Sequence, residues 1–168
     1  MDKYNKYVIL AKKKRMIDAV IISPANICFD IRTQLKYAWG CDRQLTPNAK
    51  CDNRGTTYDE RVKMVKQYKN ILLLHSHDIG QLGKVLLEIE KTAFLDGYYL
   101  AFAISACHFC KECQAIKGND CIHPEKIRPC ACLFGMDIYK TVRKLGFPID
   151  VLQDKKTIEN RYGFLLID

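Results

Sequence analysis

The chain has 168 residues, of which 48% are hydrophobic and 27% are charged, and both shares are ordinary for a globular protein. A chain of this length can bury a core of its own, so the composition excludes a small scaffold that folds only around metal. The net charge of +8 is typical of nucleic-acid binding, but the basic residues are scattered and lack an RNA-binding pattern, so nucleic acid is not the expected partner.

The predicted elements alternate between helices and short strands. Hydrophobic periodicity and capping signals predict helices near residues 1–15, 58–69, 79–96 and 135–145. Apolar and β-branched runs predict strands at 19–22, 71–74, 98–105 and 162–167. Partial alternation predicts an extended segment at 27–37. Residues 39–54 are predicted to form a loop because they are rich in Gly, Pro and Asn.

Four residues indicate where the predicted helices begin or end. Thr57, followed by Glu60 three residues later, has the pattern of a capping box. Asp78 is the expected N-cap of the longest helix, and Gly97 fits the left-handed position that ends it.

The alternation of elements predicts an α/β fold, with α+β as the related alternative, in which helices pack on a mixed β-sheet. No linker, repeat or low-complexity tract divides the chain, so residues 1–168 are predicted to form a single domain. Within it we expect a metal-binding segment at about 106–133, and a second candidate metal-binding loop at about 37–55.

The nine cysteines indicate the redox setting of the protein. No apolar run reaches the roughly eighteen residues of a membrane span, and the N-terminal segment lacks the pattern of a secretory signal peptide. We therefore expect a cytoplasmic protein that does not enter a membrane. Because thiols stay reduced in that compartment, the cysteines are predicted to be metal ligands or core residues and not disulfides.

Four cysteines form the strongest motif: Cys107, Cys110, Cys113 and Cys121 follow the pattern C-x2-C-x2-C-x7-C. Three cysteines at intervals of three can wrap a loop around one small object, and this suits the separate irons of a cubane. A zinc site more often takes two C-x2-C pairs from separate places. The motif therefore predicts a [4Fe-4S] cluster held by these four cysteines, with zinc as the alternative.

A second candidate set consists of Cys41, Cys51, Cys130 and Cys132. Cys41 and Cys51 lie in the predicted loop, where a metal ligand is more expected than a buried thiol. Cys130 and Cys132 would point to the same side of an extended chain. If the two segments meet, four thiolates are available for a second cluster; otherwise Cys130 and Cys132 are small core residues.

The four histidines are weaker candidates. For His108 and His123, beside the cluster ligands, we favour hydrogen bonding to sulfur or water over metal ligation. For His75 and His77, at the end of a strand, we favour bonds to backbone groups over a shared metal. The cations around the site are expected to be solvated or to offset its negative charge: Lys111, Lys117, Lys126 and Arg128.

Several segments resemble a family of small cysteine-rich predicted metal-binding proteins found in anaerobic archaea and bacteria. They are the run Cys107–Pro129 with its His-Pro and Arg-Pro pairs, Gly135–Ile138, Phe94–Tyr99, and Leu35–Cys41 with Cys51. The resemblance covers most of the chain from about residue 28 and implies metal binding in an anaerobic cytoplasm. Tyr37 stands where the family usually has a cysteine, which implies that a second metal site is incomplete or remodelled here.

The predicted cluster leads to three hypotheses of function. Four cysteines saturate one cluster and leave no open iron, which favours an electron-transfer carrier or redox subunit that works with a redox partner protein. The second hypothesis is an enzyme or sulfur-handling protein in which Cys41, Cys51 and one of Cys130 or Cys132 hold an incompletely ligated second cluster. The third is a zinc-stabilised nucleic-acid-binding module.

Overall fold

The computed structural model describes residues 3–40, 55–154 and 156–168. Its helices and strands are, in chain order, α1 (Asn5–Lys13), β1 (Asp18–Ile22), α2 (Ile31–Gly40), α3 (Tyr58–Gln67), β2 (Ile71–Ser76), α4 (Ile79–Leu95), β3 (Phe102–Ile104), α5 (Ile138–Lys144) and β4 (Arg161–Leu166). Short 3-10 turns include η1 (Pro24–Asn26), η3 (Ala115–Lys117) and η4 (Pro124–Lys126). Among the described residues, no helix has the length and hydropathy needed to cross a bilayer.

The four strands form one sheet in the order β1-β2-β4-β3, and all of these pairings are antiparallel. The C-terminal strand β4 lies between β2 and β3, with Phe164 opposite both Leu73 and Ile104. The predicted combination of helices and sheet is confirmed, but the sheet in the described part of the chain is antiparallel and not mixed. The mixed sheet was predicted from the alternation of helices and strands along the chain, and this alternation does not determine the direction of each strand.

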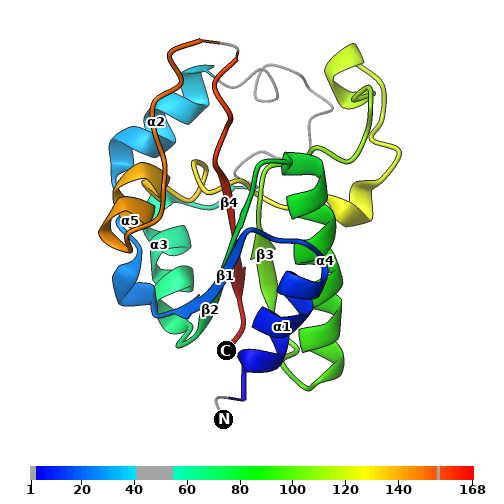
Figure 1. The fold of residues 1–168 in the computed structure, drawn as a ribbon. Helices are drawn as coiled ribbons and strands as arrows, with labels where there is room; N and C mark the ends of the chain where they lie inside the picture. The colour runs from blue at the N-terminus through cyan, green and yellow to red at the C-terminus, as the bar shows by residue number, and fades with distance from the viewer. Residues whose placement is uncertain (1–2, 41–54, 155) are drawn as a thin grey trace.

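Helices cover both faces of the sheet (Figure 1). Successive side chains of a strand point to opposite faces, so Leu72 and Leu73 of β2 belong to different hydrophobic clusters. The cluster under α1 and α4 includes Tyr7, Leu72, Leu82, Leu86, Ile89 and Leu165. The cluster on the side of α3 and α5 includes Val65, Leu73, Met136, Val142 and Phe164.

The predicted helix caps are confirmed. Thr57 Oγ1 accepts a hydrogen bond from the Glu60 backbone N–H at 3.2 Å, and the Thr57 N–H donates to Glu60 Oε2 at 2.7 Å. Asp78 Oδ1 accepts from the second and third backbone N–H groups of α4. Gly97 has a φ of 97°, the left-handed conformation that glycine adopts without strain.

The extended segment predicted at 27–37 is wrong in its second half, because α2 begins at Ile31. Asp30 starts this helix: its Oδ1 accepts a hydrogen bond from the Arg32 N–H at 2.9 Å, which is the role of an N-cap. Arg32 also pairs with the Asp30 carboxylate and lowers its pKa to about 2. The predicted strand at 98–105 is shorter, since β3 covers only Phe102–Ile104.

The predicted loop at 39–54 overlaps α2, which includes Trp39 and Gly40. The rest of that segment, with Cys41 and Cys51, lies outside the described residues.

Candidate metal centre

The segment between β3 and α5 carries the C-x2-C-x2-C-x7-C motif. Its base is closed by a hydrogen bond of 2.9 Å from the Ser105 N–H to the Pro129 carbonyl. Between these two residues, all of which are described, the chain forms only the turns η3 and η4 and no α-helix or strand. Figure 1 shows this segment, coloured yellow-green to yellow, extending past the upper end of α4.

The four cysteines of the motif line one small cavity. Its volume is about 30 Å³, and its walls are formed by Cys107, His108, Phe109, Cys110, Cys113, Gln114, Cys121, Ile122 and His123. All four cysteines are free thiols and are partly exposed. Within the described residues, however, no three His, Cys, Asp or Glu side chains lie close enough together to hold a metal ion. The ligand set therefore stays a prediction, and the structure adds that its members surround one space.

The four thiols fit a thiolate-bound metal group in kind and number. A cavity of about 30 Å³ holds roughly one water molecule, so a cubane requires the loop to widen. The loop can widen at small cost, because most side chains of residues 111–120 are exposed and no strand ladder would be broken.

Two glycines of α4 allow the loop to lie against the helix. A Cβ atom added to Gly83 would lie 3.3 Å from the Phe109 ring, and one added to Gly80 would lie 3.2 Å from the His108 carbonyl oxygen. The cavity-lining residues therefore pack beside the N-terminal turns of α4. The partial positive charge at that end of a helix stabilises thiolates.

The sequence carries a signal for this contact. Each glycine inside a helix costs about 1 kcal/mol relative to alanine, so Gly80 and Gly83 near the start of the longest helix indicate a close approach by another segment.

The other end of the loop is held by an ion pair. Arg128 donates from Nε to Glu90 Oε2 at 2.9 Å and from Nη2 to Glu90 Oε1 at 2.5 Å. Glu90 lies on α4 and also accepts from the Ala103 N–H at 2.7 Å, so it connects the loop to β3. The two side chains are only 22% and 14% exposed. Arg128 is thus an anchor of the loop, a role that the sequence did not indicate.

The second candidate set is only partly described, because Cys41 and Cys51 lie outside the described residues. Cys130 packs against the hydrophobic cluster beside α3 and α5. A hydrogen bond with the Cys132 thiol, together with burial, raises the pKa of Cys130. Residues 131–135 form turns, so the expected extended backbone is wrong, although the two thiols still meet.

Cys132 lines a second pocket, of about 430 Å³, between α2 and the start of α5. None of the four motif cysteines lines this pocket. Gly40, the residue before Cys41, lines the same pocket as Cys132.

The histidines take two kinds of position. His108 and His123 line the small cavity, and His123 Nδ1 is 3.8 Å from Glu125 Oε1. His77 Nδ1 lies 3.0 Å from the Glu159 carbonyl oxygen, as favoured from the sequence. His75 is buried, and its two ring nitrogens hydrogen-bond side chains: Asp18 at 2.9 Å and Asn160 at 2.8 Å.

Comparison with known proteins places the chain in a family. A family model described as "Predicted metal-binding protein (DUF2284)" matches residues 20–167. A search of curated proteins and a search of solved structures each found no match. The matched range contains the whole cysteine motif, the Glu90–Arg128 anchor and nearly all of the sheet. The chain belongs to this family of predicted metal-binding proteins.

Proposed function

We propose that Cys107, Cys110, Cys113 and Cys121 hold one [4Fe-4S] cluster and that the protein transfers electrons. The observation that supports this most is that all four cysteines of the motif line one cavity. In sequence order they come from three closely spaced positions and one distant position, so the chain must loop back to bring Cys121 to the others. Such a loop surrounds a compact group from several sides.

The spacing favours a cluster over a single zinc ion. In a cubane each thiolate binds a separate iron, which suits three cysteines at intervals of three residues. Around zinc, all four sulfurs must approach to about 2.3 Å of one ion, and such sites more often take two C-x2-C pairs from separate places. When bound, a cluster with four cysteine ligands supplies a one-electron redox centre with no open coordination site.

The surroundings of the cavity suit such a centre. Phe109 and Ile122 line the cavity, and partly buried Phe109 places an apolar ring beside any group held there. The N-terminal turns of α4 place a partial positive charge beside the thiolates, as Gly80 and Gly83 allow. The positive end of the helix favours the more negative, reduced form of an anionic cluster, and the apolar ring lowers the access of water to it.

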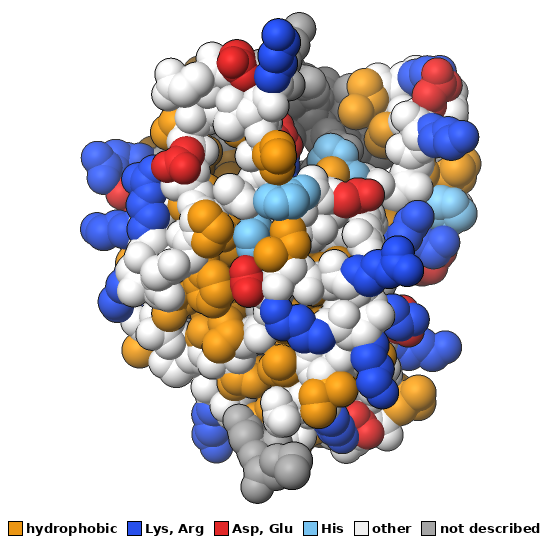
Figure 2. Space-filling view, viewed as in Figure 1, with side chains coloured by type: hydrophobic (Ala, Val, Ile, Leu, Met, Phe, Trp, Pro, Cys, Tyr) orange, Lys and Arg blue, Asp and Glu red, His pale blue; other side chains and the backbone are white. Residues whose placement is uncertain are grey.

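The partner we propose is a redox protein with an acidic surface. Lys and Arg side chains gather along the side of the molecule formed by α1 and α4 (Figure 2). Lys84 and Lys91 of α4 and Lys13 of α1 are exposed and form no salt bridge within the described residues. Unpaired surface cations attract an acidic partner and speed its docking, an effect that salt screens.

Reduction of anaerobically reconstituted protein tests the proposal. We expect a brown protein whose absorbance near about 400 nm falls reversibly on reduction, and electron transfer that slows as salt is added. Cys113→Ser should remove the chromophore, whereas Cys28→Ser, a partly buried cysteine outside the motif, should keep it. A colourless protein, or a chromophore that survives Cys113→Ser, would contradict the proposal.

A second candidate function is an enzyme or sulfur-handling protein that uses an incompletely ligated cluster beside Cys132. The supporting observation is that Gly40 and Cys132 line one pocket, while Cys41 directly follows Gly40 in the sequence. The chain supplies Cys41, Cys51 and Cys130 or Cys132 as three thiolates, which would leave one iron open to sulfide or a substrate oxygen. Replacing Cys41 and Cys51 by serine should then remove about half of the iron and leave the first site intact. Unchanged iron in that variant would exclude this function.

A further inference from the structure

Helix α2 lies beside a pocket and contacts the hydrophobic core through Tyr37. None of its ten residues is buried. Thr33, Lys36, Tyr37 and Gly40, at positions i, i+3, i+4 and i+7, share one face of the helix and line the pocket of about 430 Å³. This volume lies within the range of small-molecule sites, roughly 300–1,000 Å³. The pocket therefore has room for a small molecule against this face of α2.

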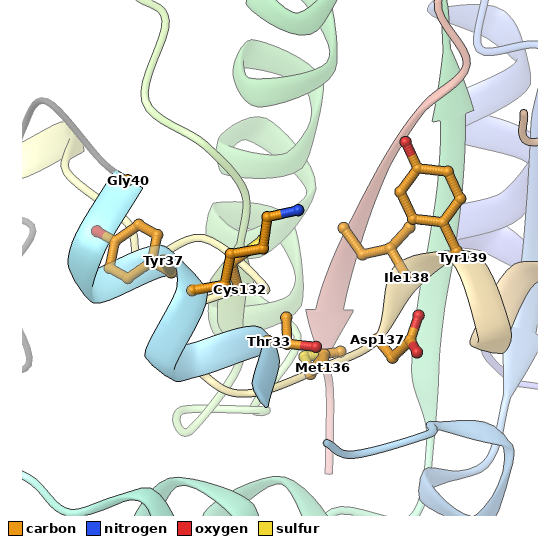
Figure 3. Close-up of a pocket in the computed structure, with 9 residues that line it drawn as sticks. Thr33, Tyr37, Gly40, Cys132, Met136, Asp137, Ile138 and Tyr139 are labelled. Atoms are coloured by element: carbon orange, nitrogen blue, oxygen red, sulfur yellow. The ribbon is translucent and has the colours of Figure 1, made fainter. Parts of the chain in front are cut away.

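The opposite wall is largely apolar and aromatic. It consists of Cys132 and the four consecutive residues Met136, Asp137, Ile138 and Tyr139. Figure 3 shows Tyr37 on the α2 side and Ile138 and Tyr139 on the α5 side of the pocket. The rings of Tyr37 and Tyr139 provide flat surfaces, which suit an aromatic ring, and the polarizable thioether of Met136 lies in the same wall.

The pocket offers one cation to an anionic group and also contains one carboxylate, since Lys36 and Asp137 both line it. Asp137 Oδ1 accepts a hydrogen bond from the Lys140 N–H at 2.9 Å, which holds this carboxylate at the start of α5. Lys36 forms no salt bridge within the described residues, so its ammonium group is available to a ligand. Thr33 supplies a hydroxyl on the same helical face.

From these features we infer that the pocket between α2 and α5 binds a small aromatic carboxylate. The ring lies between Tyr37 and Tyr139, over Met136, and the carboxylate faces the Lys36 ammonium group. The inference is independent of the proposed cluster, because none of the four motif cysteines lines this pocket.

Binding of 2-naphthoate and its neutral analogue 2-naphthamide to the full-length protein tests this inference. Methyl NMR of the methionines reports the location: Met136 should shift saturably, while Met16, buried in the cluster under α1 and α4, should not. The carboxylate should bind about three to five times more tightly than the amide, the size expected of one partly exposed charge pair.

Matched variants assign that preference to one side chain. Lys36→Gln should remove the preference for the carboxylate and leave amide binding unchanged. Lys63→Gln, an exposed lysine of α3 outside the pocket, should bind both compounds as the wild type does. Iron content, measured on the same samples, reports separately on the cluster.

Three results would overturn the inference: absence of a saturable shift at Met136, equal affinity of the two compounds for the wild type, or an unchanged preference in Lys36→Gln.

Discussion

The ion pair between Glu90 and Arg128 should contribute measurably to stability, because it is partly buried and made of two charge-assisted hydrogen bonds. Glu90→Gln keeps the shape of the side chain but removes its charge and leaves Arg128 without a carboxylate. Hydrogen bonds to charged groups contribute about 1.5–3 kcal/mol, so we expect a loss of about 2 kcal/mol in the free energy of unfolding. For a chain of this size, that corresponds to a melting temperature lower by about 4–8 °C.

The same helix offers a matched control. Glu88 pairs with Lys14 at 2.7 Å, but these side chains are 48% and 43% exposed. Exposed pairs contribute less than about 1 kcal/mol, so Glu88→Gln should change the stability little. Both variants are compared with wild type by thermal and urea unfolding of metal-free protein, followed by circular dichroism.

Two results would refute this reasoning. Equal losses of unfolding free energy in Glu88→Gln and Glu90→Gln would show that the burial of the Glu90–Arg128 pair does not add to stability. Full additivity of Glu90→Gln and Arg128→Gln in a double-mutant cycle would show that the two side chains do not interact. If both tests succeed, Glu90→Gln should also lose iron to a chelator faster than wild type, because the loop is less firmly held.

The remaining predictions concern the cysteine motif, two glycines with positive φ, and the thiol of Cys130. Cys110→Ser should abolish metal binding while keeping most of the helical circular dichroism, because the core packs without the loop; collapse of the helical signal would contradict this. Gly135→Ala should destabilise the protein by about 2–4 kcal/mol in urea unfolding, because φ is +67° and the new Cβ would lie 2.3 Å from the Tyr58 ring. Gly97→Ala, with positive φ but open space around it, should cost only about 1–2 kcal/mol. Since the pKa of Cys130 is raised, its alkylation near pH 8 should be slower than that of a free thiol and should accelerate at higher pH, as site-resolved mass spectrometry can measure.

Local chemistry made part of the fold predictable. The capping box of Thr57 and Glu60 and the N-cap Asp78 act within three residues, so the sequence alone located α3 and α4. The same kind of signal existed at Asp30, but the partial alternation of apolar residues over 27–37 favoured an extended segment, and α2 was missed. Strand direction was not predictable, because the position of β4 between β2 and β3 depends on contacts across the whole chain.

The candidate site also has one part that the sequence predicts and one part that it does not. The spacing of Cys107, Cys110 and Cys113 is a local property, and these residues do line one cavity with Cys121. The pair of Glu90 and Arg128 joins residues 38 positions apart, which no local pattern indicates.

The pocket under α2 was also beyond sequence reasoning. It depends on a helix that was predicted as extended and on its distance from α5.

Counts of iron, acid-labile sulfide and zinc per chain, made on anaerobically purified protein, test the proposed cluster most directly. We predict about four irons and about four sulfides in the motif site of the wild type, all lost in Cys113→Ser, with no stoichiometric zinc. About one zinc per chain without sulfide, or iron and sulfide contents that Cys113→Ser leaves unchanged, would contradict a [4Fe-4S] cluster at these cysteines.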